Sequence, residues 1–268
     1  MSSVVSVVPT YRPDANVESL TESLSSVSKV LVTDDGSPCT SDQRLSSIAA
    51  IPGVRMLRHH VNEGIGRGLN DGLAFAQECG AEWMLTVDQD SRLPHGYIEH
   101  LAGVADHVLS AGVRVGVMGA LHIDDASGDF TYPTEPSHDG LQPYPETEEL
   151  IASGSLWNVA ALVSIGGFDS TLGMDAIDAA ACLSLREAGY RVIALPGITF
   201  EHRIGAGERT QILGRSVLRT GHSRQRRQRI LTNRLRLFPR EWRQSPRHAI
   251  RTVRRAGVNV ILGRPSNS

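Results

Sequence analysis

The sequence has few cysteines and no long apolar run, and both shortages narrow the classes of protein to which it can belong. Its three cysteines, Cys39, Cys79 and Cys182, lie far apart and are odd in number. They therefore suggest neither a disulfide framework nor a zinc site, and a reducing cytoplasm is the natural setting. The longest uncharged stretch, residues 151–168, contains several serines and glycines. We expect it to be buried in the protein rather than to span a membrane.

A secretion signal is not expected either. No basic region precedes the apolar run Val4–Val8, which is too short for the core of a signal peptide. The 268 residues are 40% hydrophobic, enough to bury a large core as one α/β domain or as one domain with an appendage. We therefore expect a cytoplasmic protein.

Lysine is nearly absent, and the charges are divided unevenly along the chain. Residues 1–200 contain 10 Lys and Arg against 26 Asp and Glu, a net charge of −16, whereas residues 201–268 contain 17 arginines against 3 acids, a net charge of +14. Arginine pairs with phosphate in a bidentate manner, so this tail indicates a phosphorylated or anionic partner. Only Phe238 and Trp242 interleave with its arginines, so no nucleic-acid partner is expected and membrane phosphates rank first.

Strand-like and helix-like segments alternate along the first part of the chain. The expected strands are 4–8, 30–33, 54–57, 83–87 and 113–121, and the expected helices are 17–27, 64–79, 97–109 and 179–187. This order is typical of an α/β protein with a mostly parallel sheet flanked by helices. A polar loop is expected over residues 124–149, and loops of that length are usually functional.

Two carboxylates, Asp88 and Asp90, directly follow the apolar strand 83–87. Ligands gather at the carboxyl ends of strands in open α/β sheets. Side chains two residues apart on an extended segment point the same way, so these acids could bind one hard cation, Mg²⁺ or Mn²⁺, that in turn holds a diphosphate. Taken alone, the pair also fits a solvated turn.

Polar residues also follow the first two expected strands, at what should be the same edge of the sheet. Thr10, Tyr11 and Arg12 come after the first strand, and Asp34 and Asp35 after the second. A carboxylate can accept a hydrogen bond from a base or ribose, and an aromatic ring can stack on a base. Together with the acids after the fourth strand, these residues outline a nucleotide diphosphate site, although segment 34–37 alone fits a tight turn equally well.

Several motifs follow one another in a fixed order. They are Pro9-Thr10-Tyr11, Thr33-Asp34-Asp35-Gly36-Ser37, the segment from Asn62 to Gly72, Val87-Asp88-Gln89-Asp90, Ser153-Gly154-Ser155-Leu156, and segments 165–169, 174–178, 186–190 and 201–205. Their order and spacing resemble glycosyltransferase family 2, and the later motifs resemble its rhamnosyltransferase-like branch. The resemblance implies a GT-A fold over residues 1–205. Residues 206–268 are arginine-rich, and we expect them to form a helical C-terminal extension.

The resemblance also implies an inverting mechanism and its residues. Asp178 matches the general base, which would take a proton from an acceptor hydroxyl as that oxygen attacks the anomeric carbon. Asp175 is the competing position, and Asp178 could instead be a carboxylate that stabilises the start of a helix. The implied nucleotide-sugar-binding residues are Thr10, Tyr11, Arg12, Asp34, Asp35, Asn62, Gly64, Arg67 and Asp88, and the implied metal ligands are Asp88, Asp90 and His202.

Two of these residues have alternative readings of equal weight. Arg67 fits a solvated helix residue, and His202 fits a packed polar group. The chain also departs from the branch pattern at Gly173, Ala176, Ala180, Ala181, Ser184 and Thr232. These departures lie on the acceptor side, so we expect a reshaped acceptor pocket.

The resemblance makes dTDP-rhamnose the first choice of donor and UDP-activated hexoses the second. The implied acceptor is a glycan on a polyprenyl diphosphate or a growing cell-surface polysaccharide. From Pro246 onward, apolar residues recur at helical spacing among arginines. This pattern fits a peripheral helix on the inner face of the cell membrane and, equally, a helix that packs on the acidic domain.

Other functional classes remain open at this point. Asp88 and Asp90 also fit the nucleophile and acid of a haloacid-dehalogenase-type phosphatase, but that class needs a downstream cation, commonly lysine, and the single lysine, Lys29, lies upstream. A non-catalytic sugar-nucleotide-binding module is a further alternative. A dinucleotide-dependent oxidoreductase fits less well, because Leu69 stands where the third glycine of its motif belongs.

Overall fold

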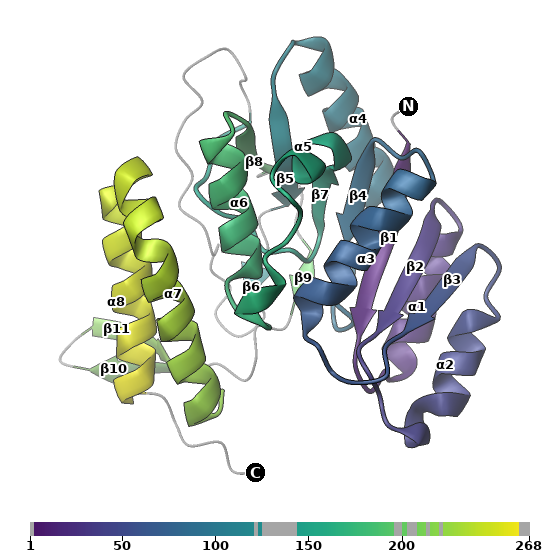
Figure 1. The fold of residues 1–268 in the computed structure, drawn as a ribbon, viewed down its shortest axis with the longest axis horizontal. Coiled ribbons are helices and arrows are strands. Elements are labelled where there is room, and N and C mark those ends of the chain that lie inside the picture. Colours follow the sequence, from purple (N-terminus) through teal and green to yellow (C-terminus); the bar gives the residue numbers. More distant parts are fainter. Residues whose placement is uncertain are drawn as a thin grey trace. The chain divides into compact units, whose positions relative to one another are not determined.

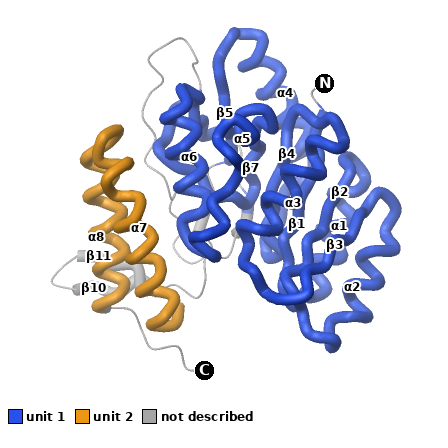
Figure 2. Tube along the Cα trace, viewed as in Figure 1, with its two compact units in different colours: residues 1–121, 132–200 blue, residues 122–131, 201–268 orange. Residues whose placement is uncertain are grey.

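The computed structural model describes residues 3–120, 123–124, 144–195, 200–202, 208–212, 215–219 and 222–262. The chain forms two compact units, residues 1–121 with 132–200 and residues 122–131 with 201–268, which Figure 2 distinguishes by colour. The division into domains expected after residue 205 stays a prediction, since a compact unit need not fold independently.

A seven-stranded sheet forms the centre of the first unit, in the order β3-β2-β1-β4-β7-β5-β8 (Figure 1). Its strands are β1 (Val4–Thr10), β2 (Lys29–Asp34), β3 (Val54–Arg58), β4 (Trp83–Thr86), β5 (Val115–Ala120), β7 (Ser155–Asn158) and β8 (Arg191–Leu195). Strand β7 is antiparallel to both of its neighbours, and the other pairings are parallel. The predicted mostly parallel α/β architecture is confirmed. The expected strands match β1 to β5, whereas β7 and β8 were not predicted.

Helices cover both faces of this sheet. They are α1 (Ala15–Ser25), α2 (Asp42–Ala49), α3 (Ile65–Glu78), α4 (Tyr97–Ser110), α5 (Val159–Ser164) and α6 (Ile177–Glu187). Val8 belongs to an apolar cluster shared with α1, α2 and α4, whereas the neighbouring Val7 faces α3. Successive strand residues point to opposite faces, so the helices form two outer layers.

Helix α3 lies unusually close to the sheet. A Cβ atom at Gly72 would stand 2.6 Å from Cγ1 of Val7, too near for any side chain. The glycine therefore allows this close packing, which fixes the start of α3 against the strand ends described below.

The long uncharged stretch is part of the first unit, as expected: residues 151–168 contain β7 and α5. None of the described helices is long and apolar enough to cross a membrane. Most of the predicted loop 124–149 lies outside the described residues. Its last part is described, and there Glu146 forms an isolated β-bridge with Ile193 of β8.

The second unit contains small sheets and a helical hairpin. Strand β6 (Ile123–Asp124) pairs with β9 (Glu201–His202), and β10 (Glu208–Ile212) pairs with β11 (Arg215–Arg219). Helices α7 (Arg224–Gln244) and α8 (Pro246–Leu262) pack on each other and are joined by Ser245. The helix expected from Pro246 is confirmed.

A single acid lies inside this hairpin. Glu241 is buried, its Oε2 atom accepts a hydrogen bond of 3.2 Å from Thr252 Oγ1, and its Oε1 atom lies 3.5 Å from Arg234 Nη1. A buried carboxylate needs such partners, because leaving it unpaired would be costly. The single acid of the hairpin is therefore buried and paired in its interior.

Candidate active site

The carboxyl ends of β2, β1 and β4 meet at one edge of the sheet, because the three strands are adjacent and parallel. Thr10 is in register with Asp34, and the backbone N–H of Asp35 donates to the Thr10 carbonyl oxygen at 2.9 Å. We call the segments 10–12, 34–37 and 88–91 the strand-end rim. The structure thereby brings together the three polar segments that the sequence placed at one edge.

Gln89 joins two of these segments. Its Oε1 atom accepts hydrogen bonds from Thr10 Oγ1 (2.6 Å) and from the Tyr11 backbone N–H (2.9 Å), and its Nε2 atom donates to the Tyr11 carbonyl oxygen (3.3 Å). One amide side chain thus fixes the backbone of the exposed Tyr11. Gln89 was not among the predicted site residues. The available signal was its place between two acids that follow an apolar strand.

Asp34 and Ser37 hold the other side of the segment 10–12. Ser37 Oγ donates to Asp34 Oδ1 (2.5 Å) and accepts a hydrogen bond of 2.7 Å from the backbone N–H of Arg12. Arg58 Nε lies 3.2 Å from Asp34 Oδ2, and the Asp34 side chain is fully buried. Arg12 has a φ of 53°, a left-handed conformation that is strained for arginine. The contacts on both sides keep the segment in this conformation.

Asp35 anchors the loop that leads into α3. Its carboxylate accepts hydrogen bonds from the backbone N–H groups of Glu63 (2.7 Å) and Gly64 (3.0 Å). His59 lies behind it, with Nδ1 at 3.5 Å from Asp35 Oδ1 and Nε2 at 2.7 Å from Asp71 Oδ2. Asp35 therefore fixes the position of the Asn62–Gly64 loop beside the rim.

Two further predicted residues belong to this region: Asn62 begins the loop, and Arg67 lies in the first turn of α3. Asn62 is exposed. Arg67 is half exposed, and its Nε atom lies 3.4 Å from Asp71 Oδ1. The solvated reading of Arg67 and the diphosphate reading are thus both compatible with its position.

Asp88 and Asp90 lie in a tight turn after β4. The Ser91 backbone N–H donates to the Asp88 carbonyl oxygen at 3.0 Å, and Ser153 Oγ accepts a hydrogen bond of 2.9 Å from the Asp88 backbone N–H. Ser91 Oγ lies 2.7 Å from Ser153 Oγ. Ser153, which belongs to one of the motifs named above but had no predicted role, therefore braces this turn from the segment that leads into β7.

A buried tyrosine supports the same brace. The hydroxyl of Tyr97 donates to the Gly154 carbonyl oxygen at 2.5 Å. Burial raises the pKa of the Tyr97 hydroxyl, which keeps it protonated and able to donate. The segment that holds the acidic turn is thus fixed by an interaction with the protein core.

The acidic turn has the chemistry of a hard-cation site. Asp88 is half-buried and Asp90 is exposed. Oxygen ligands from carboxylates suit Mg²⁺ and Mn²⁺. The third predicted ligand, His202, lies in β9 of the second unit, and its side chain is outside the described residues.

The segment that carries Asp175 and Asp178 adjoins the loop before α3. A Cβ atom at Gly64 would stand 2.7 Å from the Gly173 carbonyl oxygen, so the two backbones are in close contact. Between the two acids, Ala176 has a φ of 69°, which turns the chain sharply into α6. The predicted base is thus on a segment packed against the loop that Asp35 holds.

Asp178 is the second residue of α6, and its Oδ1 atom accepts a hydrogen bond of 2.8 Å from the Ala179 backbone N–H. Its position fits the helix-stabilising reading. The same position favours the charged carboxylate, which is the form that accepts a proton. Burial raises the pKa of the nearby Cys182 thiol, and the negative charge of Asp178 adds to that effect. Asp175 is buried.

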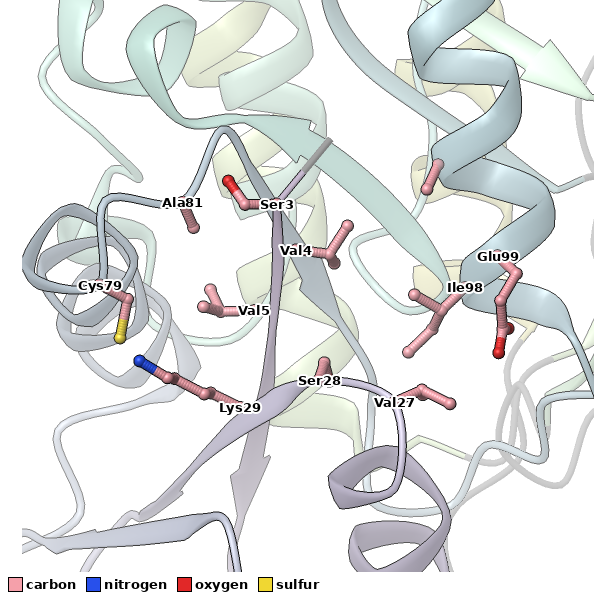
Figure 3. A pocket seen from close by; sticks show the side chains of 11 residues that line it. Ser3, Val4, Val5, Val27, Ser28, Lys29, Cys79, Ala81, Ile98 and Glu99 are labelled. Atoms are coloured by element: carbon pink, nitrogen blue, oxygen red, sulfur yellow. The ribbon is translucent and has the colours of Figure 1, made fainter. Parts of the chain in front are cut away.

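A depression of about 540 Å³ lies at the opposite edge of the sheet, at the starts of β1 and β2 (Figure 3). Val5, Lys29, Cys79 and Glu99 are among its lining residues. It contains none of the predicted site residues. This depression therefore plays no part in the predicted chemistry.

Comparisons with known proteins bear on this site. The family model described as glycosyl transferase family 2 matches residues 6–136. The dTDP-rhamnosyl transferase RfbF of Shigella flexneri is 28% identical over 217 residues, which are 76% of this chain and 70% of that protein.

Solved structures share the fold at low sequence identity. S. aureus TarS, which has also been solved with UDP and with UDP-GlcNAc, matches with a TM-score of 0.55 and 17% identity, over 76% of this chain and 37% of TarS. The chain thus spans well under half of that protein. The mannosyltransferase PcManGT of Pyrobaculum calidifontis, solved with GDP-Man and Mn²⁺, matches with a TM-score of 0.61 and 16% identity, over 97% of this chain and 70% of PcManGT. The fold is therefore that of GT-A glycosyltransferases, and the two sequence matches support a rhamnosyltransferase-like protein of glycosyltransferase family 2.

Proposed function

We propose that the protein is a metal-dependent, inverting glycosyltransferase that moves a sugar from a nucleoside diphosphate donor to a hydroxyl acceptor. The observation that carries the proposal is the strand-end rim. There an exposed aromatic ring, the anchored loop before α3 and a two-carboxylate turn lie at adjacent strand ends. A base, a diphosphate and a divalent cation would each find suitable groups along it.

On the donor side, the residues divide into those that touch the ligand and those that hold them. The Tyr11 ring, 39% exposed, can stack on the base, while Thr10, Arg12 and Asp35 border the same segment. Asn62, Gly64 and Arg67 would lie beside the diphosphate. Asp34 is buried against Ser37 and Arg58, so we assign it to holding the turn rather than to direct contact with the base.

On the chemical side, Asp178 would act as the base. Its carboxylate would take the proton of the acceptor hydroxyl while that oxygen forms the new bond to the anomeric carbon and the nucleoside diphosphate leaves, so that no covalent intermediate is needed. Asp88 and Asp90, with His202 as the third ligand, would hold Mg²⁺ or Mn²⁺. The ion would supply charge stabilisation for the departing diphosphate.

The choice of donor and acceptor is supported by the relative. RfbF is a dTDP-rhamnosyl transferase, and dTDP-rhamnose is therefore our first choice of donor, ahead of UDP-activated hexoses. We propose that the acceptor is a polyprenyl-diphosphate-linked glycan or a growing cell-surface polysaccharide. The reaction would then take place on the cytoplasmic face of the membrane, with the protein bound peripherally.

The test is release of nucleoside diphosphate. The full chain would be incubated with Mn²⁺, each candidate donor in turn and a glycan acceptor. Release of dTDP that requires both the acceptor and Asp178 is the expected result. Release of inorganic phosphate from phosphate esters would favour the phosphatase reading instead. Saturable donor binding with no release would leave a non-catalytic binding module.

A further inference from the structure

The α7–α8 hairpin carries a strongly charged surface that the reaction itself does not use. Between residues 222 and 262 the sequence has twelve arginines and one acid, Glu241, which is buried and contacts Thr252 and Arg234. The exposed face of the hairpin is therefore cationic without any carboxylate of its own. We infer that this face binds the surface of a membrane that contains anionic phospholipids.

Part of this face lies near the tip of the hairpin. Helix α7 ends at Gln244 and α8 begins at Pro246, so the exposed Arg243 and Arg247 lie at the same end. On α8, Arg254 follows Arg247 by two helical turns, so both lie on one side of that helix. We call Trp242, Arg243, Arg247, Ile250 and Arg254 the hairpin tip.

The hairpin tip also offers apolar groups beside its charges. Trp242 is 46% exposed and Ile250 is 52% exposed, and the Trp242 ring lies 5.6 Å from that of Phe238. A tryptophan flanked by arginines suits the boundary between lipid headgroups and acyl chains, where the ring has an apolar body and a polar N–H. Guanidinium groups pair with lipid phosphates in a bidentate manner.

This combination favours a lipid surface over other anionic partners. Nucleic acid would be met by cations that track a phosphate backbone, with aromatic side chains spaced for successive bases. Among the described residues of the hairpin, however, Trp242 is the single exposed aromatic residue, and the other exposed large apolar side chains, Leu235, Ile250 and Ile261, are aliphatic. The inference deepens the proposed function, since a membrane-bound chain would meet lipid-linked acceptors. Vesicle binding, however, is measured without donor or acceptor, so its result is independent of whether the protein transfers a sugar.

The structure supplies its own optical probe for the experiment. Of the three tryptophans, Trp83 and Trp157 are fully buried and Trp242 is exposed. The full chain would be mixed at low salt with vesicles of phosphatidylglycerol and phosphatidylethanolamine, and separately with phosphatidylcholine vesicles. We expect binding to the anionic vesicles alone, with a blue shift of the emission and quenching by brominated lipid. High salt should weaken this binding.

Two triple variants, each of which lacks three arginines, test which part of the protein binds the vesicles. Arg243→Gln, Arg247→Gln and Arg254→Gln together should weaken binding to anionic vesicles by about 100-fold, because each arginine near an anionic surface contributes roughly 1 kcal/mol. The control removes three arginines of the first unit, as Arg44→Gln, Arg55→Gln and Arg114→Gln. It should bind as the natural chain does. Trp242→Phe should keep the binding and lose the blue shift.

Several results would overturn the inference. If the natural chain ignores anionic vesicles at low salt, the hairpin surface does not bind membranes. Equal loss of binding in the control variant would assign the effect to net charge alone. Retention on duplex DNA without vesicle binding would assign the surface to nucleic acid. Circular dichroism of both variants checks that the hairpin is folded.

Discussion

The first unit, which contains the strand-end rim, and the α7–α8 hairpin differ in how their charged side chains are paired. In the first unit, surface cations meet acids within the protein, as Arg44 meets Glu18 at 2.8 Å and Arg55 meets Glu78 at 2.7 Å. In the hairpin, twelve arginines accompany one buried acid. Within the described residues, cations of the first unit thus have acids of the same unit beside them, whereas the hairpin contains a single acid for its twelve arginines.

The difference extends to what the charges do. The carboxylates of the rim are oriented by specific hydrogen bonds, such as those from Glu63 and Gly64 to Asp35, and such groups serve positioning and chemistry. The cations of the hairpin tip form an exposed field, which serves attraction to a surface. Changes at the rim should consequently alter catalysis, and changes at the hairpin should alter location.

The largest effect is expected from loss of the metal. EDTA should abolish transfer, because the departing diphosphate would lose its charge stabilisation. Asp90→Ala should reduce both donor affinity and rate, measured by donor binding and by release of nucleoside diphosphate. Vesicle binding should be unaffected by either change, which provides the control. Undiminished turnover in EDTA would contradict the assignment of Asp88 and Asp90.

The second effect concerns the base. Asp178→Asn keeps the size of the side chain and removes its ability to accept a proton, so turnover should fall by roughly 100-fold or more while donor binding survives. Steady-state kinetics with saturating donor would measure the loss. Asp175→Asn is the matched comparison. If that variant proves to be the inactive one, the base is Asp175.

A smaller effect is expected at Gln89. Gln89→Leu removes three hydrogen bonds to the segment that carries Tyr11 without altering either acid of the turn. We expect the KM for the donor to rise by about 10-fold, since hydrogen bonds of this kind contribute on the order of 1 kcal/mol each and solvent replaces part of the loss. The value of kcat should change less.

Gln89→Glu is the conservative control for that prediction. A glutamate retains the oxygen that accepts from Thr10 and Tyr11 but lacks the donor to the Tyr11 carbonyl. Its KM should lie between those of the natural chain and Gln89→Leu. A KM that stays constant in both variants would show that Gln89 does not position the donor segment.

Much of the fold could be predicted because apolar runs and helical spacing mark buried elements directly. The strands β1 to β5 and the convergence of their polar ends follow from this pattern and from the rule that parallel strands share their carboxyl edge. The antiparallel β7 could not be predicted in this way. An apolar segment such as Ser155–Asn158 fits a buried strand or a buried helix, and its residues do not state which neighbours it pairs with or in which direction.

The supporting residues of the site were also beyond prediction. Gln89 contacts Tyr11 at a separation of 78 residues, and Ser153 contacts Ser91 at a separation of 62. Such contacts depend on the assembled sheet, and the residue types involved are common in loops. The left-handed Ala176 is a further case, since alanine gives no sign of a positive φ. The roles proposed for the site residues themselves stay predictions.

The smallest expected effect is on the free energy of unfolding, and it compares the loss of one arginine from the first unit with the loss of one from the hairpin. Arg44→Gln removes a partner from Glu18 and should destabilise the protein by about 0.5 kcal/mol, the usual worth of an exposed ion pair. Arg236→Gln, at an exposed position of α7, removes one cation from a crowded cationic face and should leave stability unchanged or raise it by a similar amount. Urea unfolding at low salt would measure both, and the two values should converge at high salt because screening weakens each interaction. A clear loss of stability in Arg236→Gln would mean that Arg236 has a stabilising acidic partner within the chain, and the comparison between the two regions would fail.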